Sequence, residues 1–304
     1  MEKKYKGIYV VVCTPFGPTG EVDEAALRRH IRYVIDEGGV QGIIPCGSTG
    51  EFALLNEAER TRVIEVTVNE VHHQLPVIAG AAACATRDVV ANGQRAKSLG
   101  VDGIMVVPPY YGGLSQEDLY IHYKTVATSV DLPLVVYNNT GTTHSDILPD
   151  TVAQLAEIDN IVAIKESTGL MQRVIDIMHR CGDQIEVLCG CDTLAYEMMA
   201  VGVEGWIAAP ANVAAKQCVK LYKLMFVEKD VAAAKAYYRR IRPLFDLFEG
   251  SGKYVQLAKA GLGIPRPPLH VASNDLQAQL QGILKLNCCH PPQRSFVERS
   301  WSAI

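Results

Sequence analysis

The sequence predicts an α/β protein whose parallel strands close into a barrel. Short apolar runs rich in Val and Ile recur eight times, and stretches with helical periodicity separate them. Parallel strands need crossover connections, which are usually helices. Continuous apolar runs are expected where both faces of a sheet are covered. Eight alternations of strand and helix therefore favour a (β/α)8 barrel.

The predicted elements follow one another in order along the chain. The apolar runs lie at residues 8–13, 40–46, 76–80, 103–107, 133–137, 161–165, 185–189 and 204–208. The helical stretches between them include residues 23–37, 57–73, 86–99, 115–129 and 168–180. Asp23 stands where the first helix needs an N-cap, and Gly38 and Gly39 follow its predicted end. These start and stop signals support a helix between the first two strands.

The pattern changes after the eighth apolar run. Residues 212–248 and roughly 253–286 have helical periodicity, which is broken by residues 250–252 and by the proline-rich residues 265–268. We expect a barrel core over residues 1–210 that carries the active site. We also expect C-terminal helices over residues 211–286, including the last barrel helix, and a disordered tail over residues 287–304.

Composition and charge restrict the classes of function. The chain has 304 residues, a net charge of −4 and an isoelectric point of about 6.1. Neither value indicates nucleic acid or an anionic membrane as a partner. The N-terminal lysines are followed by a short apolar run without a small-residue cleavage site, which we interpret as a first strand and not a signal peptide. No apolar stretch is long enough to span a bilayer.

The nine cysteines are scattered through the predicted strands and helices. This distribution is typical of reduced, buried thiols in a cytoplasmic protein. Cys189 and Cys191 are too close together and too isolated for a structural zinc site, because no second Cys or His pair has ligand spacing. We therefore expect a cytoplasmic protein without a metal or a cofactor.

Two reactive side chains end neighbouring predicted strands, at the end of the barrel where barrel enzymes place catalysis. Lys165 is the last residue of the run IVAIK. An amine held against apolar walls loses solvation, and the neutral amine can then form a Schiff base with a ketone. Tyr137 ends the run PLVVY, and a phenol beside such a lysine can pass protons to and from the substrate.

Both residues also have ordinary structural explanations. A lysine at this position can extend to the barrel rim or pair with Glu166. A tyrosine at a strand end commonly packs and hydrogen-bonds to the backbone. The two residues by themselves leave these alternatives open.

A polar loop follows the second predicted strand. Its sequence is Gly47-Ser48-Thr49-Gly50-Glu51. Glycines allow the backbone to turn sharply and expose its N–H groups, and the two hydroxyls add donors. Such a loop suits a carboxylate. It is not a phosphate-binding P-loop, because the Lys-Ser/Thr ending is missing.

Weaker candidates lie in other loops. Tyr110 and Tyr111 follow two prolines and are suited to lining a site or packing at an interface. Gly190 and Asp192 follow the seventh strand, where Asp192 can simply cap the next helix. His144 differs from the other histidines because it lies in the loop after the fifth strand.

Four motifs together resemble one superfamily, that of dihydrodipicolinate synthase and N-acetylneuraminate lyase. They are GSTGE after strand two, PPYY after strand four, YN ending strand five and IKES ending strand six. The resemblance runs from about residue 7 to at least residue 270. It implies a (β/α)8 TIM barrel with a C-terminal helical domain, and a homotetramer. It also implies cofactor-free chemistry through a Schiff base between a lysine and pyruvate or another 2-oxo acid.

The resemblance assigns roles to individual residues. Lys165 matches the Schiff-base lysine, and Tyr137 matches the proton-relay tyrosine. Thr49 matches a hydroxyl of the relay, and Tyr111 matches the tyrosine that a neighbouring subunit lends to it. The amides of the GSTG turn are expected to hold the carboxylate of the 2-oxo acid. The substrate-binding residues that we expect are Gly47, Ser48, Thr49, Gly50, Thr142, His144, Ser167, Gly190, Asp192 and Ile207.

The loop after Tyr137 departs from the synthase pattern. Synthases usually follow YN with a segment such as VPSRTG, whose arginine grips the carboxylate of the second substrate, and here Thr142 holds that position. A guanidinium–carboxylate clamp is bidentate, and a threonine cannot replace it. The first hydroxyl position of the loop holds Ser48, as it does in neuraminate lyases and sugar-acid aldolases, which this loop resembles. Asp192 is suited to binding sugar hydroxyls.

We therefore predict a class I lyase or aldolase that makes or breaks a carbon–carbon bond between pyruvate and an aldehyde. The expected aldehyde is hydroxylated, of the 2-keto-3-deoxy sugar acid type. The alternatives are 4-hydroxy-tetrahydrodipicolinate (dihydrodipicolinate) synthase, with the arginine's role moved elsewhere, and a 2-keto-3-deoxy acid dehydratase. A non-catalytic 2-oxo acid sensor is a further alternative, against which the intact Lys165 and Tyr137 argue, because binding needs neither.

Overall fold

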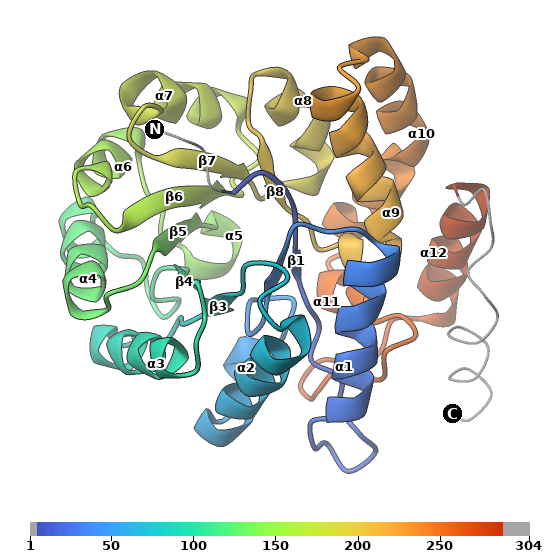
Figure 1. Cartoon of the computed structure of the whole chain (residues 1–304), viewed down its shortest axis with the longest axis horizontal. Helices are drawn as coiled ribbons and strands as arrows, with labels where there is room; N and C mark the ends of the chain where they lie inside the picture. Colours follow the sequence, from blue (N-terminus) through green and yellow to red (C-terminus); the bar gives the residue numbers. More distant parts are fainter. Residues whose placement is uncertain (1–4, 288–304) are drawn as a thin grey trace.

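A computed structural model describes residues 5–287 and contains an eight-stranded sheet (Figure 1). The strands are β1 (Gly7–Val11), β2 (Gly42–Ile44), β3 (Ile78–Gly80), β4 (Gly103–Val106), β5 (Leu134–Asn138), β6 (Ile161–Glu166), β7 (Glu186–Cys189) and β8 (Gly205–Ile207). Their spatial order is β2-β1-β8-β7-β6-β5-β4-β3, and every pairing in this order is parallel. The outer strands β2 and β3 are joined by a parallel bridge between Ile43 and Val77. The sheet thus closes, and the predicted barrel is confirmed.

Helices follow the strands and surround the sheet (Figure 1). The α-helices are α1 (Glu24–Arg32), α2 (Glu57–Val71), α3 (Thr86–Ser98), α4 (Gln116–Ser129), α5 (Thr140–Thr143), α6 (Pro149–Ala156), α7 (Met171–Cys181), α8 (Ala195–Ala200), α9 (Ala211–Tyr222), α10 (Val231–Gly250), α11 (Tyr254–Ala258) and α12 (Asn274–Asn287). Two π-helical turns, η1 (Tyr33–Glu37) and η4 (Lys223–Val227), continue α1 and α9. Two 3₁₀ turns are η2 (Phe52–Leu54) and η3 (Asp192–Leu194).

Side-chain caps explain where several helices begin. The Asp23 side chain accepts a hydrogen bond from the backbone N–H of Ala26, as the sequence predicts for an N-cap. The Asn56 side chain and Glu59 form a reciprocal capping box at α2. Each cap satisfies backbone N–H groups that the first turn of a helix leaves without a partner.

The C-terminal helices differ from the predicted ones. The stretch predicted as one helix over 212–248 divides between η4 and α10, because Lys229 adopts a left-handed φ of 57° and Asp230 caps a new helix by accepting from Ala233 N. Between α11 and α12 lies a proline-rich loop. The short helix α5 lies in the polar segment after β5, for which no helix was predicted. Of the tail predicted over 287–304, residues 288–304 lie outside the described residues.

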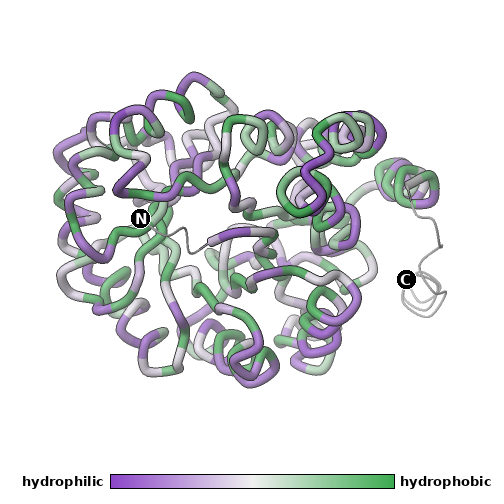
Figure 2. Tube along the Cα trace, turned by 45° about the horizontal axis from the view of Figure 1, so that its top comes forward, coloured by the Kyte–Doolittle hydropathy of each residue, from purple (hydrophilic) through white to green (hydrophobic). Residues whose placement is uncertain are grey.

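The core forms where the strands meet and where α10 packs against the barrel. Figure 2 shows hydrophobic segments along the strands in the interior and hydrophilic positions on the outer faces of the helices. Trp206 of β8 is fully buried, and its ring contacts Phe245 of α10 edge to face at a centroid distance of 5.4 Å. Helix α10 is thus held against the side of the barrel that carries β8. Among residues 5–287, no helix has the length and apolar character needed to cross a membrane.

Candidate active site

Lys165 and Tyr137 are direct neighbours in the barrel. They are register partners on the adjacent strands β6 and β5, so their side chains project to the same side of the sheet. The Nζ atom of Lys165 lies 4.0 Å from the centroid of the Tyr137 ring. Both residues are 6% exposed, so the amine is held in the barrel and does not extend to the rim. The structure therefore places the predicted nucleophile against the predicted proton carrier.

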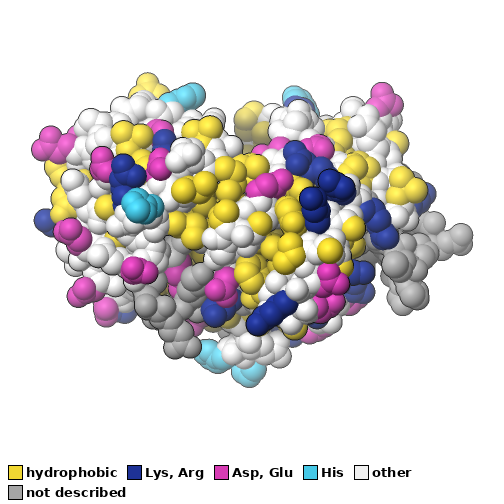
Figure 3. Space-filling model, turned by 90° about the horizontal axis from the view of Figure 1, so that it is seen from above, with side chains coloured by type: hydrophobic (Ala, Val, Ile, Leu, Met, Phe, Trp, Pro, Cys, Tyr) yellow, Lys and Arg dark blue, Asp and Glu magenta, His cyan; other side chains and the backbone are white. Residues whose placement is uncertain are grey.

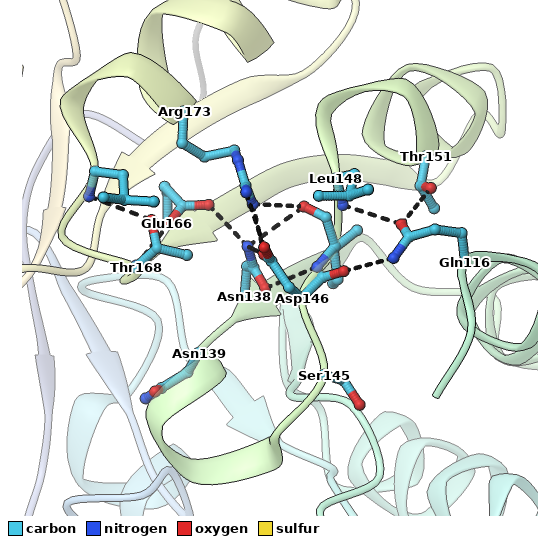
Figure 4. Close-up of polar contacts among 12 residues, drawn as sticks. Gln116, Asn138, Asn139, Ser145, Asp146, Leu148, Thr151, Glu166, Thr168 and Arg173 are labelled. Carbon is cyan, nitrogen blue, oxygen red and sulfur yellow. Dashed lines mark hydrogen bonds and ion pairs between the residues drawn. The ribbon is translucent and has the colours of Figure 1, made fainter. Parts of the chain in front are cut away.

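Glu166 does not form the ion pair that was the structural alternative for Lys165. Successive residues of a strand point to opposite faces, so Glu166 is directed away from Lys165. Its carboxylate accepts hydrogen bonds from Thr168 N at 2.7 Å and from Asn138 Nδ2 at 3.1 Å (Figure 4). Burial raises the pKa of the Glu166 carboxyl above its ordinary value. Glu166 thus braces the end of β5 and forms no ion pair with Lys165.

A polar network shapes the loop that follows β5. Arg173 of α7 binds both carboxylate oxygens of Asp146, at 2.5 and 2.8 Å, and also donates to the carbonyl oxygen of Ile147 (Figure 4). The guanidinium holds the pKa of the Asp146 carboxyl below its usual range. Asn138 Nδ2 reaches Asp146 Oδ1 at 3.1 Å from the end of β5. The loop is therefore tied down at its far end, and the Arg173 guanidinium is engaged by Asp146.

The near end of the same loop contacts Tyr137. Asn139 Nδ2 donates a hydrogen bond to the Tyr137 Oη atom at 2.8 Å. Because the phenol oxygen accepts this bond, the phenol hydrogen stays available for donation. Thr142 is exposed, and its hydroxyl makes a 3.4 Å contact with the Asn139 carbonyl oxygen. His144 is also exposed, with a left-handed φ of 55°.

The Gly-rich loop after β2 forms two consecutive tight turns. Gly50 N donates to Gly47 O and Glu51 N donates to Ser48 O, both at 3.0 Å. These two amides are therefore already used inside the loop. The amides of Ser48 and Thr49, in contrast, donate no hydrogen bond to any residue that the structure describes. Two adjacent free amides at the carboxyl end of a barrel strand suit a carboxylate ligand.

Ser167 and Gly190 lie against the lysine. Ser167 Oγ donates to the carbonyl oxygen of Gly190 at 2.8 Å. A Cβ atom on Gly190 would lie 2.8 Å from Lys165 Cε and 2.1 Å from Ser167 Oγ. Glycine at 190 therefore leaves the space that the lysine side chain occupies. Ile207 of β8 is also buried, at 2% exposure.

Asp192, which we expect to read substrate hydroxyls, has its carboxylate bound to side chains inside the protein. Its side chain is fully buried, and its two carboxylate oxygens accept hydrogen bonds from Trp206 Nε1, at 2.8 Å, and from the hydroxyl of Tyr254. Burial, followed by the nearby charge of Glu249, raises the pKa of Asp192 to about 7. The carboxyl is thus committed to contacts inside the protein, between β8 and α11.

Tyr111 lies outside this group within one chain. Its side chain is 90% exposed, whereas the adjacent Tyr110 packs edge to face on Phe52 at a centroid distance of 5.9 Å. The structure thus brings Lys165, Tyr137, Ser167 and Gly190 together and leaves Tyr111 at the surface. Within the described part of the chain, no cluster of three or more His, Cys, Asp or Glu side chains is arranged to hold a metal.

Sequence reasoning missed residues that support the site from behind. The sequence suggests Glu166 only as a partner of Lys165, and it suggests no role for Asp146 and Arg173. The available signal was the polar residue that directly follows each reactive one, Asn138 after Tyr137 and Glu166 after Lys165. Alternation along a strand places both behind the barrel wall, where they bond to each other at 3.1 Å.

Comparison with known proteins agrees with this geometry. The profile of the Dihydrodipicolinate synthetase family matches residues 4–287. The 4-hydroxy-tetrahydrodipicolinate synthase of Geotalea uraniireducens is 44% identical over 289 residues, which cover 92% of this chain and 98% of the relative. The enzyme of the same name from Geotalea daltonii is 45% identical over 238 residues, covering 78% of this chain and 81% of the relative.

A solved structure is similarly close in fold. The dihydrodipicolinate synthase of Thermotoga maritima superposes with a TM-score of 0.89 at 31% sequence identity, over 94% of this chain and 99% of that one. A match of this extent includes C-terminal helices as well as the barrel. The chain therefore belongs to the dihydrodipicolinate synthetase family, and it is a class I lyase of that family.

Proposed function

We propose that the protein is a 4-hydroxy-tetrahydrodipicolinate synthase that condenses pyruvate with aspartate semialdehyde through a Schiff base on Lys165. The observation that carries the proposal is the in-register pair of Lys165 and Tyr137, with Nζ 4.0 Å from the ring centroid. Relatives 44–45% identical carry this name. They support this alternative over the hydroxylated aldehyde that the loop sequence led us to expect.

The proposed reaction uses groups that lie within the barrel. The Lys165 amine adds to C2 of pyruvate, and loss of water leaves an iminium. Release of a proton from C3 gives an enamine, whose C3 attacks the carbonyl carbon of the aldehyde. The Tyr137 phenol passes protons to and from these intermediates, with its oxygen held by Asn139. The free amides of Ser48 and Thr49 receive the pyruvate carboxylate, and Thr49 adds a hydroxyl to the relay.

Covalent trapping tests the proposal. Incubation with pyruvate and borohydride, followed by digestion and mass mapping, should place a reduced pyruvate adduct on Lys165. Lys165→Ala should abolish both adduct and turnover. Tyr137→Phe should keep the adduct but slow turnover by about 10²- to 10⁴-fold, the usual contribution of positioned acid–base catalysis.

Lys220→Ala is a matched control for the trapping experiment. Lys220 also lies over a tyrosine ring, that of Tyr237, at 4.9 Å, but on the exposed surface. We expect this variant to behave as the wild type does. An adduct on a lysine other than 165 would refute the assignment. No adduct at all would instead support the 2-oxo acid sensor.

Thr142 favours a second candidate, an aldolase for hydroxylated aldehydes. It is exposed in the loop beside Tyr137, at the position where the family resemblance leads us to expect an arginine. Loss of a charge-assisted hydrogen bond costs about 1.5–3 kcal/mol, or roughly one to two decades in kcat/KM. Neutral hydroxyls favour hydroxylated substrates over carboxylates, and the same argument holds for a 2-keto-3-deoxy acid dehydratase.

Kinetics with and without an arginine separate the two candidates. The measurement is kcat/KM for aspartate semialdehyde and for a panel of hydroxyaldehydes, for wild type, Thr142→Arg and the surface control Thr125→Arg. If the synthase assignment is right, the wild type prefers aspartate semialdehyde at neutral pH and Thr142→Arg adds little. If the second candidate is right, hydroxyaldehydes are preferred and only Thr142→Arg gains activity with aspartate semialdehyde.

We also propose that the active form is a homo-oligomer, specifically a tetramer. The exposed Tyr111 is suited to completing the relay of a neighbouring subunit. Figure 3, which views the molecule from the side of α7, α8 and α10, shows hydrophobic side chains gathered on this face. Leu170, Ile175 and Val201, at or near α7 and α8, are 40–55% exposed. Light scattering at assay concentration tests the proposal, and an active monomer would refute it.

A further inference from the structure

A buried ion pair joins the Gly-rich loop to the C-terminal part of the chain. Lys259 Nζ lies 2.5 Å from Glu51 Oε1, although the two residues are 208 positions apart. Each side chain is 1% exposed. Glu51 is the last residue of the GSTGE loop, and Lys259 directly follows α11.

The chain after α11 encloses the Glu51 carboxylate. Oε2 accepts a hydrogen bond from Arg266 N at 2.8 Å, while Lys259 Nζ also donates to the carbonyl oxygen of Ile264 at 2.9 Å. The Lys259 ammonium lies 4.2 Å above the ring centroid of Phe16. Both charges therefore have further protein partners besides each other, which is the condition under which a buried pair is tolerated.

Glu51 also fixes the backbone next to the proposed carboxylate site. It has a left-handed φ of 58°, which is unfavourable for a residue with a side chain. Its amide closes a turn onto Ser48 O at 3.0 Å, and the carbonyl oxygen of Gly50 accepts from Thr14 Oγ1 at 2.8 Å. These contacts hold the end of the turn that contains the amides of Ser48 and Thr49.

Stability alone does not require this ion pair. Replacing a buried pair with apolar residues of similar volume is often neutral or stabilising, so such a pair is better explained by the specific geometry it imposes. The geometry that this ion pair imposes is that of the GSTGE loop, in which the amides of Ser48 and Thr49 have no partner among the described residues. We therefore expect the ion pair to keep Glu51 in its left-handed backbone conformation, and with it the turn that the Glu51 amide closes.

We propose that Glu51 and Lys259 are positioning residues that orient the Ser48 and Thr49 amides for the carboxylate of the 2-oxo acid. The inference rests on the proposed function, because it assigns the carboxylate of pyruvate to this loop. It makes the segment from α11 to Arg266 a determinant of affinity for the 2-oxo acid, although that segment contributes no reacting group.

The test compares pyruvate affinity in Glu51→Gln and Lys259→Met with wild type. The readout is the pyruvate concentration that gives half-maximal borohydride trapping on Lys165, together with kcat at saturating pyruvate. Misaligned amides weaken binding of the 2-oxo acid but leave the lysine and tyrosine in place. We expect the half-saturating concentration to rise about tenfold or more, with kcat within about threefold of wild type. We also expect the double variant to be no worse than the poorer single variant, because the two residues act as one unit.

Arg266→Met is the matched control on the same segment. The Arg266 side chain binds Glu59, Leu54 O and Gly20 O, whereas its backbone N–H, which the substitution keeps, binds Glu51. The control thus weakens the attachment of the segment without removing the Glu51–Lys259 charge pair. We expect it to lower thermal stability with little change in half-saturation.

Three results would overturn the inference. The first is unchanged half-saturation in Glu51→Gln, a nearly isosteric variant suited to the measurement even if Lys259→Met does not fold. The second is a half-saturating pyruvate concentration that rises as much in Arg266→Met as in the Glu51 and Lys259 variants, at the same loss of stability. This result would indicate a general structural role. The third is a fall in kcat with unchanged half-saturation. If wild type itself forms no adduct with pyruvate, the proposed function fails first, and the two failures are thereby distinguished.

Discussion

The C-terminal helices meet the mouth of the barrel at two buried carboxylates that are stabilised differently. Glu51 is paired with Lys259 at 2.5 Å. Asp192 is fully buried too, but its carboxylate oxygens accept from an indole N–H and a phenol, and its own amide donates to Glu249 of α10 at 2.9 Å. An ion pair can keep a buried carboxylate charged, whereas burial beside a second acid favours the protonated form, even where neutral donors oppose it. The carboxylate of Glu51 is therefore buried with a charged partner, whereas that of Asp192 is buried with neutral partners.

Removing the cation from the charged contact should have the largest effect on stability. Lys259→Met leaves the Glu51 carboxylate buried without its partner, and we expect a loss of about 3–5 kcal/mol in the free energy of unfolding. The double variant Glu51→Gln/Lys259→Met should lose less than Lys259→Met alone, because it leaves no buried charge. Urea unfolding measures both values. A double variant that is less stable by the sum of the two single losses would contradict the picture of a coupled pair.

The buried Asp192 carboxyl should instead make the free energy of unfolding depend on pH. In the folded chain Asp192 keeps its proton until about pH 7, whereas the ordinary pKa is 3.8. A raised pKa means that the stabilisation is fully present below about pH 3.8 and is lost as the pH rises through about 7. Asn at 192 cannot ionise, so wild type should lose stability relative to Asp192→Asn between these values. The folded and ordinary pKa values of Asp192 differ by roughly 3. Each pH unit of that difference is worth about 1.36 kcal/mol, so the expected loss in the free energy of unfolding is about 4 kcal/mol.

The groups that face Asp192 define the control for this measurement. Glu249 raises its pKa, whereas the charge of Lys165 and the hydrogen bonds from Tyr254 and Trp206 lower it. Glu249→Gln should therefore move the loss of stability to lower pH. A difference between wild type and Asp192→Asn that stays constant from about pH 4 to about pH 8 would show that Asp192 does not titrate in this range.

The smallest effect on stability is expected at Tyr111, which lies at the surface of the chain. Its side chain is 90% exposed, so Tyr111→Phe should change the free energy of unfolding by less than about 0.5 kcal/mol. If a neighbouring subunit uses this phenol, the same variant should lose activity while light scattering shows an unchanged assembly. Tyr120→Phe, on the outer helix α4, serves as the comparison. Full activity in Tyr111→Phe would remove Tyr111 from the proposed relay.

Much of the barrel could be predicted because its signals are local. Each strand is a continuous apolar run, and each of the eight runs contains residues of an observed strand. Lys165 and Tyr137 could be paired because each ends a run, and the ends of neighbouring parallel strands meet at one end of a barrel. The division of the helix predicted over 212–248 was less visible, because the polar residues at 228–230 fit an exposed helix face as well as a break.

The sequence by itself determined the strands, the placement of Lys165 and Tyr137 at the ends of neighbouring strands, and the family. Only the tertiary structure decided that Asp192 is enclosed between Trp206 and Tyr254, that Glu51 is joined to Lys259, and that the amides of Ser48 and Thr49 have no partner among the described residues. The reason is physical. Periodicity reports how a residue relates to its own helix or strand, whereas the state of a buried charge depends on donors that come from distant parts of the chain.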